Sequence, residues 1–370
     1  MSSYIPETLK KVTDSYASCE HLLHAERYGS GHINETYRLT CRSWDGKPVQ
    51  YILQSLSPAA FPNPQQVMEN FAGITEHLRK KIEAAGGDPM RETLRLFRTK
   101  DGKDFYTAPD GSAWRLIPFI ENTVCLQMAT PELFEASARA FGRFQMLLAD
   151  YPIETLHETI VGFHDSEKRF ANFLEALKQD KMGRAKDIGP EIQFVLDREK
   201  DCSVLLDAHR KGDLPLRVTH NDTKLNNVLF DEMTMEGICV IDLDTTMPGL
   251  SVYDFGDSIR FGANHCAEDE KDLSKVNFDL DLYRRYTRGF LEGAQGTLTE
   301  KEKEHLPWGA KLMTLECGIR FLTDYLEGDH YFRIHYPEQN LDRCRTQFKL
   351  VADMETCWKE MHRIVKDLEA

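Results

Sequence analysis

The sequence predicts an α+β fold of two lobes, a small N-terminal lobe built on an antiparallel sheet and a large helical C-terminal lobe. The chain has 370 residues, which exceeds the roughly 100–200 residues that one hydrophobic core usually serves. The chain up to Ile120 is rich in strand patterns, whereas helical periodicity dominates beyond Glu121. We therefore expect one lobe over residues 1–122 and the other over residues 123–370.

Each element of the expected N-terminal lobe follows from a local pattern. Amphipathic spacing predicts a helix over residues 5–24. Alternation with glycine and aspartate punctuation predicts three antiparallel strands over residues 25–56. Helical spacing returns over residues 62–84, and two further strands are expected at 94–98 and 112–120.

The expected C-terminal lobe consists of helices around one strand-rich stretch. Apolar residues recur at helical spacing in these segments: 131–151, 166–180, 190–211, 279–293, 300–327 and 338–368. Between them, Val228–Phe230 and Ile238–Ile241 are typical of two buried strands of a hairpin. A hairpin brings the polar residues beside its strands to one point, so we expect the functional site there.

The overall charge argues against a nucleic-acid partner. With 46 basic and 60 acidic residues, the formal net charge is −14, which disfavours electrostatic recognition of a phosphate backbone. A small anionic ligand stays compatible with this charge, because local donors and a metal offset an unfavourable field. We expect a small-molecule partner, and a monomer or a weak homo-oligomer.

The cysteine pattern and the N-terminal segment indicate a cytoplasmic protein. Nine cysteines are scattered singly without a CxxC pair, which is typical of reduced, buried thiols. The N-terminal segment lacks an apolar signal core, and no stretch approaches the ~20 apolar residues of a membrane span. We therefore expect reduced cysteines, no membrane partner and a cytoplasmic location.

Three polar residues of the central stretch match the needs of metal-assisted phosphoryl transfer, which are to hold a metal, align an acceptor hydroxyl and offset charge. Asp222 follows a strand and can accept the proton of the hydroxyl. Asn227 offers a neutral oxygen to Mg²⁺, and Asp242 offers an anionic one. Each residue alone also fits a turn cap, but the ordered set HxDxxxxN followed by IDxD favours catalysis.

Two neighbours of this set are assigned structural roles. We expect His220 to hydrogen-bond within the loop and to hold Asp222, rather than to act as an acid or base. Residues 254–256 spell the DFG of protein kinases, but Asp242 already occupies the metal position on its strand. We therefore expect Asp254 to cap the following helix or to brace the catalytic loop.

A glycine turn lies between the first two expected strands. Its backbone N–H groups could approach a phosphate, so that the turn would cover a nucleotide. A plain hairpin turn explains the same residues, because short glycine motifs occur often by chance. The turn consists of Gly29, Ser30, Gly31 and His32.

With these motifs the chain resembles the aminoglycoside phosphotransferase and choline kinase superfamily, which has a two-lobed protein-kinase-like fold. HxDxxxxN and IDxD match at His220–Asn227 and Asp242–Asp244. Longer strings, among them RVTHNDTKLNNVLFD, IDLDTTMPG and ECGIRFLTDYLEGDHYF, are similar to the N-acetylhexosamine 1-kinases over nearly the whole chain.

The resemblance implies transfer of phosphate from ATP, with Mg²⁺, to the anomeric C1 hydroxyl of N-acetylglucosamine or N-acetylgalactosamine. Asp222 would deprotonate that hydroxyl, while Asn227 and Asp242 would hold the metal. Asp244 would have a secondary role at the same metal. The nucleotide would lie between the glycine turn and a hinge whose backbone groups meet adenine, formed by Phe119, Ile120, Glu121 and Asn122.

The same resemblance implies the acceptor contacts. Arg320 and Tyr331 would contact the sugar, with Phe261 and His32 as further contributors. Without the resemblance, Arg320 fits a surface ion pair and the aromatic residues fit a core. A kinase for another sugar or an amino alcohol, and a catalytically inactive nucleotide-binding protein of this fold, stay open as alternatives.

One position departs from the superfamily. The strand that usually carries a phosphate-binding lysine reads YILQSL, so Gln54 stands where a positive charge is expected. An amide can hydrogen-bond phosphate oxygens but cannot neutralise them. Glu69 in the following helix would then lack its usual ion-pair partner.

Overall fold

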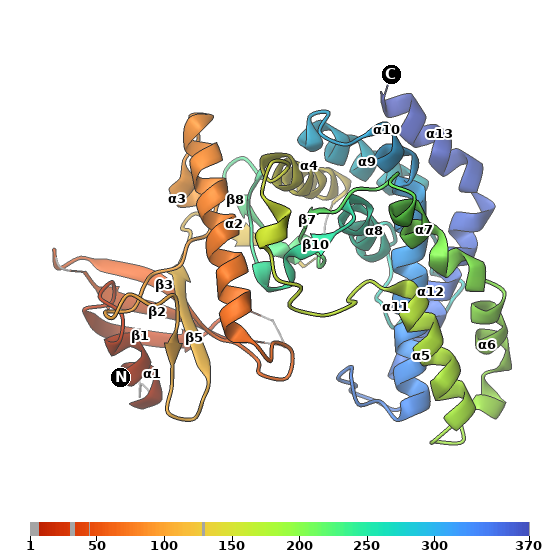
Figure 1. The fold of residues 1–370 in the computed structure, drawn as a ribbon, viewed down its shortest axis with the longest axis horizontal. Helices are drawn as coiled ribbons and strands as arrows, with labels where there is room; N and C mark the ends of the chain where they lie inside the picture. Colours follow the sequence, from red (N-terminus) through yellow and green to blue (C-terminus); the bar gives the residue numbers. More distant parts are fainter. Residues whose placement is uncertain (1–6, 30–33, 44, 128–129, 370) are drawn as a thin grey trace.

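The computed structural model of the chain describes residues 7–29, 34–43, 45–127 and 130–369. It shows a five-stranded antiparallel sheet with a long helix beside it, and a larger body made mostly of helices (Figure 1). The predicted α+β architecture, with a small sheet lobe and a large helical lobe, is therefore confirmed.

The N-terminal lobe is organised around its sheet, whose strands lie in the order β1-β2-β3-β5-β4. Apolar alternation forms these strands, and polar turns separate them. The elements are α1 (Glu7–Asp14), β1 (His21–Arg27), β2 (Glu35–Arg42), β3 (Pro48–Ser55), α2 (Pro64–Ala84), α3 (Pro89–Glu92), β4 (Tyr106–Thr107) and β5 (Ala113–Pro118).

The two faces of this sheet pack against different parts of the protein. Leu53 points to the face that packs against α1. Ile52 and Ile117 point to the opposite face, toward α2 and the helical lobe. Because side chains alternate along a strand, Gln54 and Arg115 share that second face.

The helix expected over residues 5–24 is much shorter than predicted. It ends at Asp14, and the residues from His21 onward form β1. Tyr16 is fully buried beneath the sheet, and its hydroxyl donates to the backbone oxygen of Trp114 at 2.7 Å. This tertiary contact outweighs the local helical spacing.

The strand expected at 94–98 does not form. Only Phe97 bridges to the sheet, through one pairing with Leu116 of β5. A single bridge leaves the segment outside the ladder, so the prediction is wrong there. The other strands and the long helix expected in this lobe are present.

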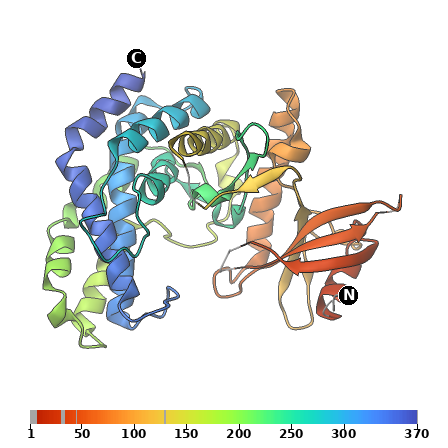
Figure 2. The same cartoon turned by 180° about the vertical axis from the view of Figure 1, so that it is seen from behind.

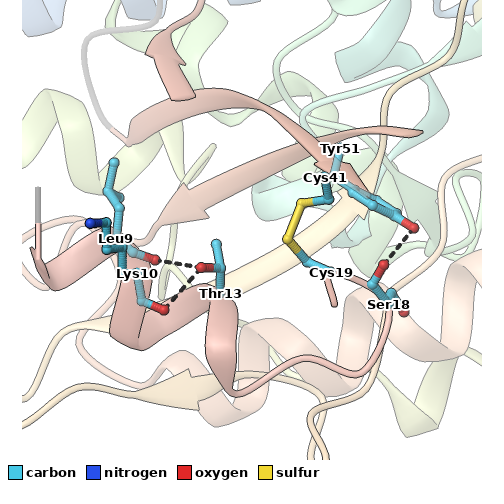
Figure 3. The surroundings of a disulfide bond; sticks show 7 residues. All are labelled: Leu9, Lys10, Thr13, Ser18, Cys19, Cys41 and Tyr51. Atoms are coloured by element: carbon cyan, nitrogen blue, oxygen red, sulfur yellow. Dashed lines mark hydrogen bonds between the residues drawn. A yellow bond between two sulfur atoms is a disulfide. The ribbon is translucent and has the colours of Figure 1, made fainter. Parts of the chain in front are cut away.

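The expectation of reduced cysteines is wrong for one pair. Cys19 and Cys41 form a disulfide, which ties the segment after α1 to β2 (Figure 3). Cys41 lies opposite Leu22 of β1, and Cys19 lies just before that strand. The sheet register thus joins residues whose sequence separation is 22, a proximity that no spacing motif records. The other cysteines are thiols.

The helical lobe contains the expected helices, but residues 190–211, 300–327 and 338–368 are each split in two. In the second case Pro307 stands in the first turn of a new helix, where the absence of its N–H is tolerated. The helices are α4 (Pro131–Leu147), α5 (Ser166–Gln179), α6 (Gly189–Leu196), α7 (Val204–Arg210), α8 (Ser251–Gly262), α9 (Leu280–Ala294), α10 (Glu300–Glu304), α11 (Leu306–Glu327), α12 (Gln339–Thr356) and α13 (Trp358–Glu369).

Two small antiparallel sheets complete this lobe. The predicted hairpin is confirmed as the pairing of β8 with β9. The strands are β6 (Thr123–Cys125), β8 (Val228–Asp231) and β9 (Gly237–Val240) in one sheet, and β7 (Arg217–Thr219) with β10 (Met247–Gly249) in the other. Residues 119–122 connect the N-terminal sheet to β6.

The largest of the hydrophobic clusters extends across both lobes. It includes Ile52 and Ile117 of the N-terminal sheet, Phe71 of α2, and Phe141 and Phe230 of the helical lobe. Helix α2 lies between the sheet and the helical lobe in both views (Figure 1 and Figure 2). Apolar contacts therefore join the lobes, although the chain is long enough for two cores. Across the described part of the chain, no helix is long and apolar enough to span a membrane.

Candidate active site

The predicted catalytic loop lies between β7 and β8 and is held by Asp254 of α8. One oxygen of Asp254 accepts the backbone N–H of His220 at 3.0 Å, and the other accepts that of Asn221 at 2.8 Å. Asp254 is 0% exposed, and this burial raises the pKa of its carboxyl group. The predicted bracing role is confirmed. The helix-cap alternative is wrong, because Asp254 lies inside the first turn of α8.

His220 orients the loop through both nitrogens of its ring. Nε2 donates to the backbone oxygen of Ile241 at 2.8 Å, and Nδ1 accepts the N–H of Asp222 at 3.3 Å. The buried ring meets Phe141 and Phe144 edge to face. A neutral imidazole satisfies both contacts, so the predicted structural role is confirmed.

Asp222, Asn227 and Asp242 meet at one end of the β8–β9 hairpin. The amide nitrogen of Asn227 donates to the backbone oxygen of Asp222 at 2.8 Å and to its Oδ2 at 3.2 Å. The backbone oxygen of Asn227 accepts the N–H of Ile241 at 2.9 Å, which places Asp242 beside Asn227 across the hairpin. The backbone register thus brings the three residues together, as the hairpin pattern predicts.

Asp242 sits at a strained and acidic point. Its φ of 60° is uncommon for a residue other than glycine. Although the residue as a whole is exposed, desolvation of its carboxylate and the negative charges of Asp244 and Asp222 raise the pKa of Asp242 to about 6. A bound cation would relieve the repulsion.

The donor set fits a hard cation such as Mg²⁺. The amide nitrogen of Asn227 is the atom that bonds Asp222, which leaves the amide oxygen to join the carboxylate of Asp242. In the residues that the structure describes, no three His, Cys, Asp or Glu side chains form a complete metal centre. Further ligands would therefore come from phosphate oxygens and water.

Lys224 is a site residue that the sequence reasoning missed. Its Nζ lies 2.6 Å from Oδ1 of Asp222. Burial by itself lowers the pKa of Lys224, but the charges of Asp222 and Asp257 outweigh it, so the pKa is raised. The string DTK within the catalytic loop was the available signal, two residues beyond Asp222.

Asp244 contacts the N-terminal lobe. Nη1 of Arg115 pairs with one of its oxygens, and Nη2 lies 3.1 Å from the other. Asn34 donates to the second oxygen at 2.6 Å. Protein donors therefore satisfy both oxygens, an arrangement that disfavours the expected role of Asp244 at the metal. The expected phosphate contact, Gln54, is also engaged with Arg115, at 2.9 Å and 2.7 Å.

The glycine turn begins beside the hinge. Tyr28 meets the ring of Phe119 edge to face, with centroids 5.8 Å apart. The guanidinium of Arg38 lies over both rings, at 5.5 Å and 5.6 Å. Gly29 has a φ of 79°, which favours glycine. The start of the turn, at Gly29, therefore lies close to the hinge, and the covering role of the turn stays a prediction.

The other hinge and turn residues keep their expected roles as predictions. The backbone oxygen of Ile120 accepts the hydroxyl of Thr123 at 2.7 Å, and Glu121 has an exposed side chain. The remaining turn residues lie outside the described part of the chain: Ser30, Gly31 and His32.

Arg320 and Tyr331 lie together at the end of α11. Nη2 of Arg320 donates to the hydroxyl of Tyr331 at 3.2 Å. The guanidinium also lies 5.4–5.5 Å from the ring centroids of Phe163, Tyr331 and Phe332. Tyr331 is 68% exposed and Phe261 is 37% exposed, so the alternative reading of both as core residues is wrong.

A chain of contacts links this region to the catalytic loop. Nε2 of His164 lies 3.4 Å from the backbone oxygen of Asn221, and Nδ1 lies 3.0 Å from Oε1 of Glu316. Glu316 precedes Arg320 by four residues on α11, so both lie on one helix face. The face that carries Arg320 therefore packs behind the catalytic loop.

A family model described as the phosphotransferase enzyme family matches residues 24–288, which include the catalytic loop and the hairpin. The chain belongs to the phosphotransferase enzyme family. Among solved structures, an aminoglycoside phosphotransferase from Alicyclobacillus acidocaldarius shares 13% identity and a TM-score of 0.57, over 100% of this chain and 96% of that chain. The microcompartment-associated aminopropanol kinase shares 14% identity and a TM-score of 0.55, over 96% and 98%.

A spectinomycin phosphotransferase in complex with ADP and spectinomycin shares 13% identity and a TM-score of 0.50 with this phosphotransferase, over 99% of each chain. At such identities the likeness shows the fold. The family match ends at residue 288, so Arg320 and Tyr331 lie beyond it. The family match therefore spans Asp222, Asn227 and Asp242 and leaves the acceptor to other arguments.

Proposed function

We propose that this phosphotransferase transfers the terminal phosphate of ATP, with Mg²⁺, to the anomeric C1 hydroxyl of N-acetylglucosamine or N-acetylgalactosamine. The observation that carries the reaction type is the meeting of Asp222, Asn227 and Asp242 at one end of the hairpin. The choice of sugar and of C1 rests on the sequence strings around the site and on the character of the Arg320 region.

Asp222 acts as the general base. Its side chain is 27% exposed, so an acceptor hydroxyl can reach it. Lys224 contacts Oδ1 and Asn227 contacts Oδ2, which fixes the orientation of the carboxylate. As the bond from the hydroxyl oxygen to phosphorus forms, its proton passes to Asp222 and the bond to the leaving ADP oxygen breaks.

The other site residues offset the negative charge of the phosphates. Lys224 carries a positive charge beside the base, where it can offset negative charge on the transferred phosphate. The side-chain oxygen of Asn227 and the carboxylate of Asp242 would hold Mg²⁺. The ion would supply positive charge that offsets part of the negative charge of the phosphates.

The region around Arg320 supports a neutral, hydroxylated acceptor. The guanidinium already occupies the faces of three aromatic rings, where a cationic amino alcohol or aminoglycoside would meet like charge. Sugar hydroxyls and an acetamido oxygen accept hydrogen bonds from a guanidinium, and a sugar ring packs against aromatic side chains. The chemistry of this surface therefore favours the sugar.

The deciding experiment is a phosphoryl-transfer assay with ATP and Mg²⁺ across N-acetylhexosamines, plain hexoses, choline, aminopropanol and aminoglycosides. NMR then assigns the position of phosphate on each product. We expect turnover of N-acetylhexosamines with phosphate at C1. Phosphate at C6, or transfer only to a cationic acceptor, would overturn the proposal.

Arg320→Ala tests the acceptor assignment directly. We expect the sugar KM to rise by about 10-fold or more, because a charged hydrogen-bond donor to the acceptor contributes about 1.5–3 kcal/mol. The ATP KM should change by less than about twofold. An unchanged sugar KM would remove Arg320 from the acceptor site.

A further inference from the structure

The positive charge that Gln54 does not provide lies one strand away, on Arg115. Gln54 of β3 and Arg115 of β5 are direct partners in the antiparallel register, so their side chains share one face of the sheet. Oε1 of Gln54 accepts from Nε of Arg115 at 2.9 Å and from Nη2 at 2.7 Å. A lysine at position 54 would repel this guanidinium, whereas the glutamine orients it. The departure at Gln54 therefore has a structural partner.

Arg115 reaches across to the helical lobe. Its guanidinium forms a two-pronged ion pair with Asp244, which lies two residues beyond the metal candidate Asp242. Arg115 is 1% exposed, and Asp244 is also buried. The guanidinium lies 4.7 Å from the ring of Phe71 on α2. A charge this deeply buried depends on its partner, because an unpaired buried charge is strongly destabilising.

Two more bonds fasten the same segment to the N-terminal lobe. Asn34, just before β2, donates to Asp244 at 2.6 Å. Asn70 of α2 donates to the backbone oxygen of Thr246 at 3.2 Å. Residues 244–246 are therefore tied to β5, to the start of β2 and to α2. The position of the neighbouring metal ligand thus depends on the N-terminal lobe.

In protein kinases, an ion pair between a strand lysine and a helix glutamate keeps the active arrangement within the N-terminal lobe. The matching glutamate here, Glu69, pairs instead with His157 at 2.7 Å. We propose that the Arg115–Asp244 pair performs this task instead. Arg115 acts as a positioning residue: it holds residues 242–246, which include the metal candidate Asp242, in place against the N-terminal sheet. This inference depends on the proposed function in one respect: it assumes that Asp242 binds the metal ion of a bound nucleotide.

The test is a double-mutant cycle of Arg115→Met and Asp244→Asn, read by calorimetry of ADP binding with and without Mg²⁺. We expect Arg115→Met to weaken Mg²⁺–ADP binding by at least about 10-fold and to change metal-free ADP binding by less than about threefold. In the Asp244→Asn background, Arg115→Met should cost less than about threefold, because the carboxylate that it positions is gone. Mg²⁺–ADP binding within twofold of wild type in Arg115→Met, or additive effects of the two changes, would overturn the proposal.

Arg198→Met is the matched control. Arg198 pairs with both oxygens of Glu355, at 3.0 Å and 2.6 Å, and lies 3.4 Å from the ring of Phe194. It repeats the chemistry of Arg115, but in the helical lobe between α6 and α7. We expect its Mg²⁺–ADP binding to match wild type. An equal loss in this control would show that the Arg115 effect is general destabilisation.

A second variant covers the case in which Arg115→Met does not fold. Arg115→Lys keeps the charge and loses the second prong, and we expect a folded protein with Mg²⁺–ADP binding weakened about 3–10-fold. If Arg115→Lys and Asn70→Ala, as two single variants, both bound Mg²⁺–ADP with wild-type affinity, the proposal would be overturned. Because ADP binding is measured without an acceptor, failure of sugar phosphorylation would count against the proposed function and leave this result standing.

Discussion

Two loops of this phosphotransferase are each held by one buried carboxylate, and they differ in what they leave open. Asp254 accepts the backbone N–H groups of residues 220–221 in the catalytic loop. Asp324 accepts those of residues 330–332, at 2.8–2.9 Å; this loop carries the proposed acceptor contact Tyr331 and is called the acceptor loop below. The catalytic loop lies inside the protein, whereas the acceptor loop extends from the end of α11 (Figure 1) and exposes Tyr331.

This difference predicts which loop governs turnover and which governs acceptor affinity. In the catalytic loop, the side chains of His220, Asn221 and Asn227 have fixed hydrogen-bond partners, and the loss of one costs about 1–3 kcal/mol. In the exposed loop, the carboxylate fixes the backbone, but water can replace contacts of the side chains. Substitutions in the catalytic loop should therefore change turnover, and substitutions in the acceptor loop should change acceptor affinity.

Asp222→Asn should give the largest effect. An amide cannot take the proton of the acceptor hydroxyl, so we expect kcat to fall by about 1,000-fold or more. Sugar binding, measured by calorimetry, should stay within about threefold of wild type. Turnover close to wild type would remove Asp222 as the base.

Asp254→Asn tests the brace beneath the catalytic loop. An asparagine side chain has one oxygen for the two N–H groups that Asp254 accepts, so one of them loses its partner. We expect kcat to fall by about 30- to 100-fold with the sugar KM within about threefold. A rise in sugar KM with kcat preserved would contradict the separation of the two loops.

Asp324→Asn makes the same chemical change beneath the acceptor loop. We expect the sugar KM to rise about 3- to 10-fold while kcat and the ATP KM stay within about twofold. The matched control is Asp279→Asn, where the carboxylate accepts two backbone N–H groups at the start of α9. This control should keep wild-type kinetics. A fall in kcat for Asp324→Asn, without a change in KM, would show that the two loops act as one unit.

Asp242→Asn should give the smallest effect, on stability without ligands. The folded state raises the pKa of Asp242 from 3.8 to about 6, so its contribution to stability is largest below pH 4 and is lost as pH rises through about 6. An asparagine never ionises and avoids this loss. We expect the variant to melt at a higher temperature than wild type at pH 8, with the gain shrinking toward pH 5. A gain independent of pH would contradict the crowded, acidic setting of Asp242.

Much of the catalytic loop was predictable because its partners are close in sequence. Asp222 and Asn227 stand five residues apart, and the bond from His220 to Asp254 spans 34 residues of one stretch. Strand alternation within that stretch predicts a hairpin, and the hairpin brings the polar groups together. Lys224 was overlooked because its one signal, the string DTK, is too short to distinguish from chance.

The features that sequence reasoning missed join distant segments. Arg115 and Asp244 are 129 residues apart, and Asn34 and Asp244 are 210 apart. The disulfide between Cys19 and Cys41 depends in the same way on the register of two strands. Register and lobe packing follow from the burial of many side chains at once, so no local pattern encodes these pairs.

By itself, the sequence determined the α+β architecture, the hairpin and the candidate residues of the reaction, because local periodicity and short motifs encode them. Only the tertiary structure decided that Gln54 accepts hydrogen bonds from Arg115 and that Asp244 joins the two lobes. The physical reason is that a buried ion pair is stable only where folding removes both charges from water at the same place. That place exists only after the sheet, α2 and the hairpin have packed together.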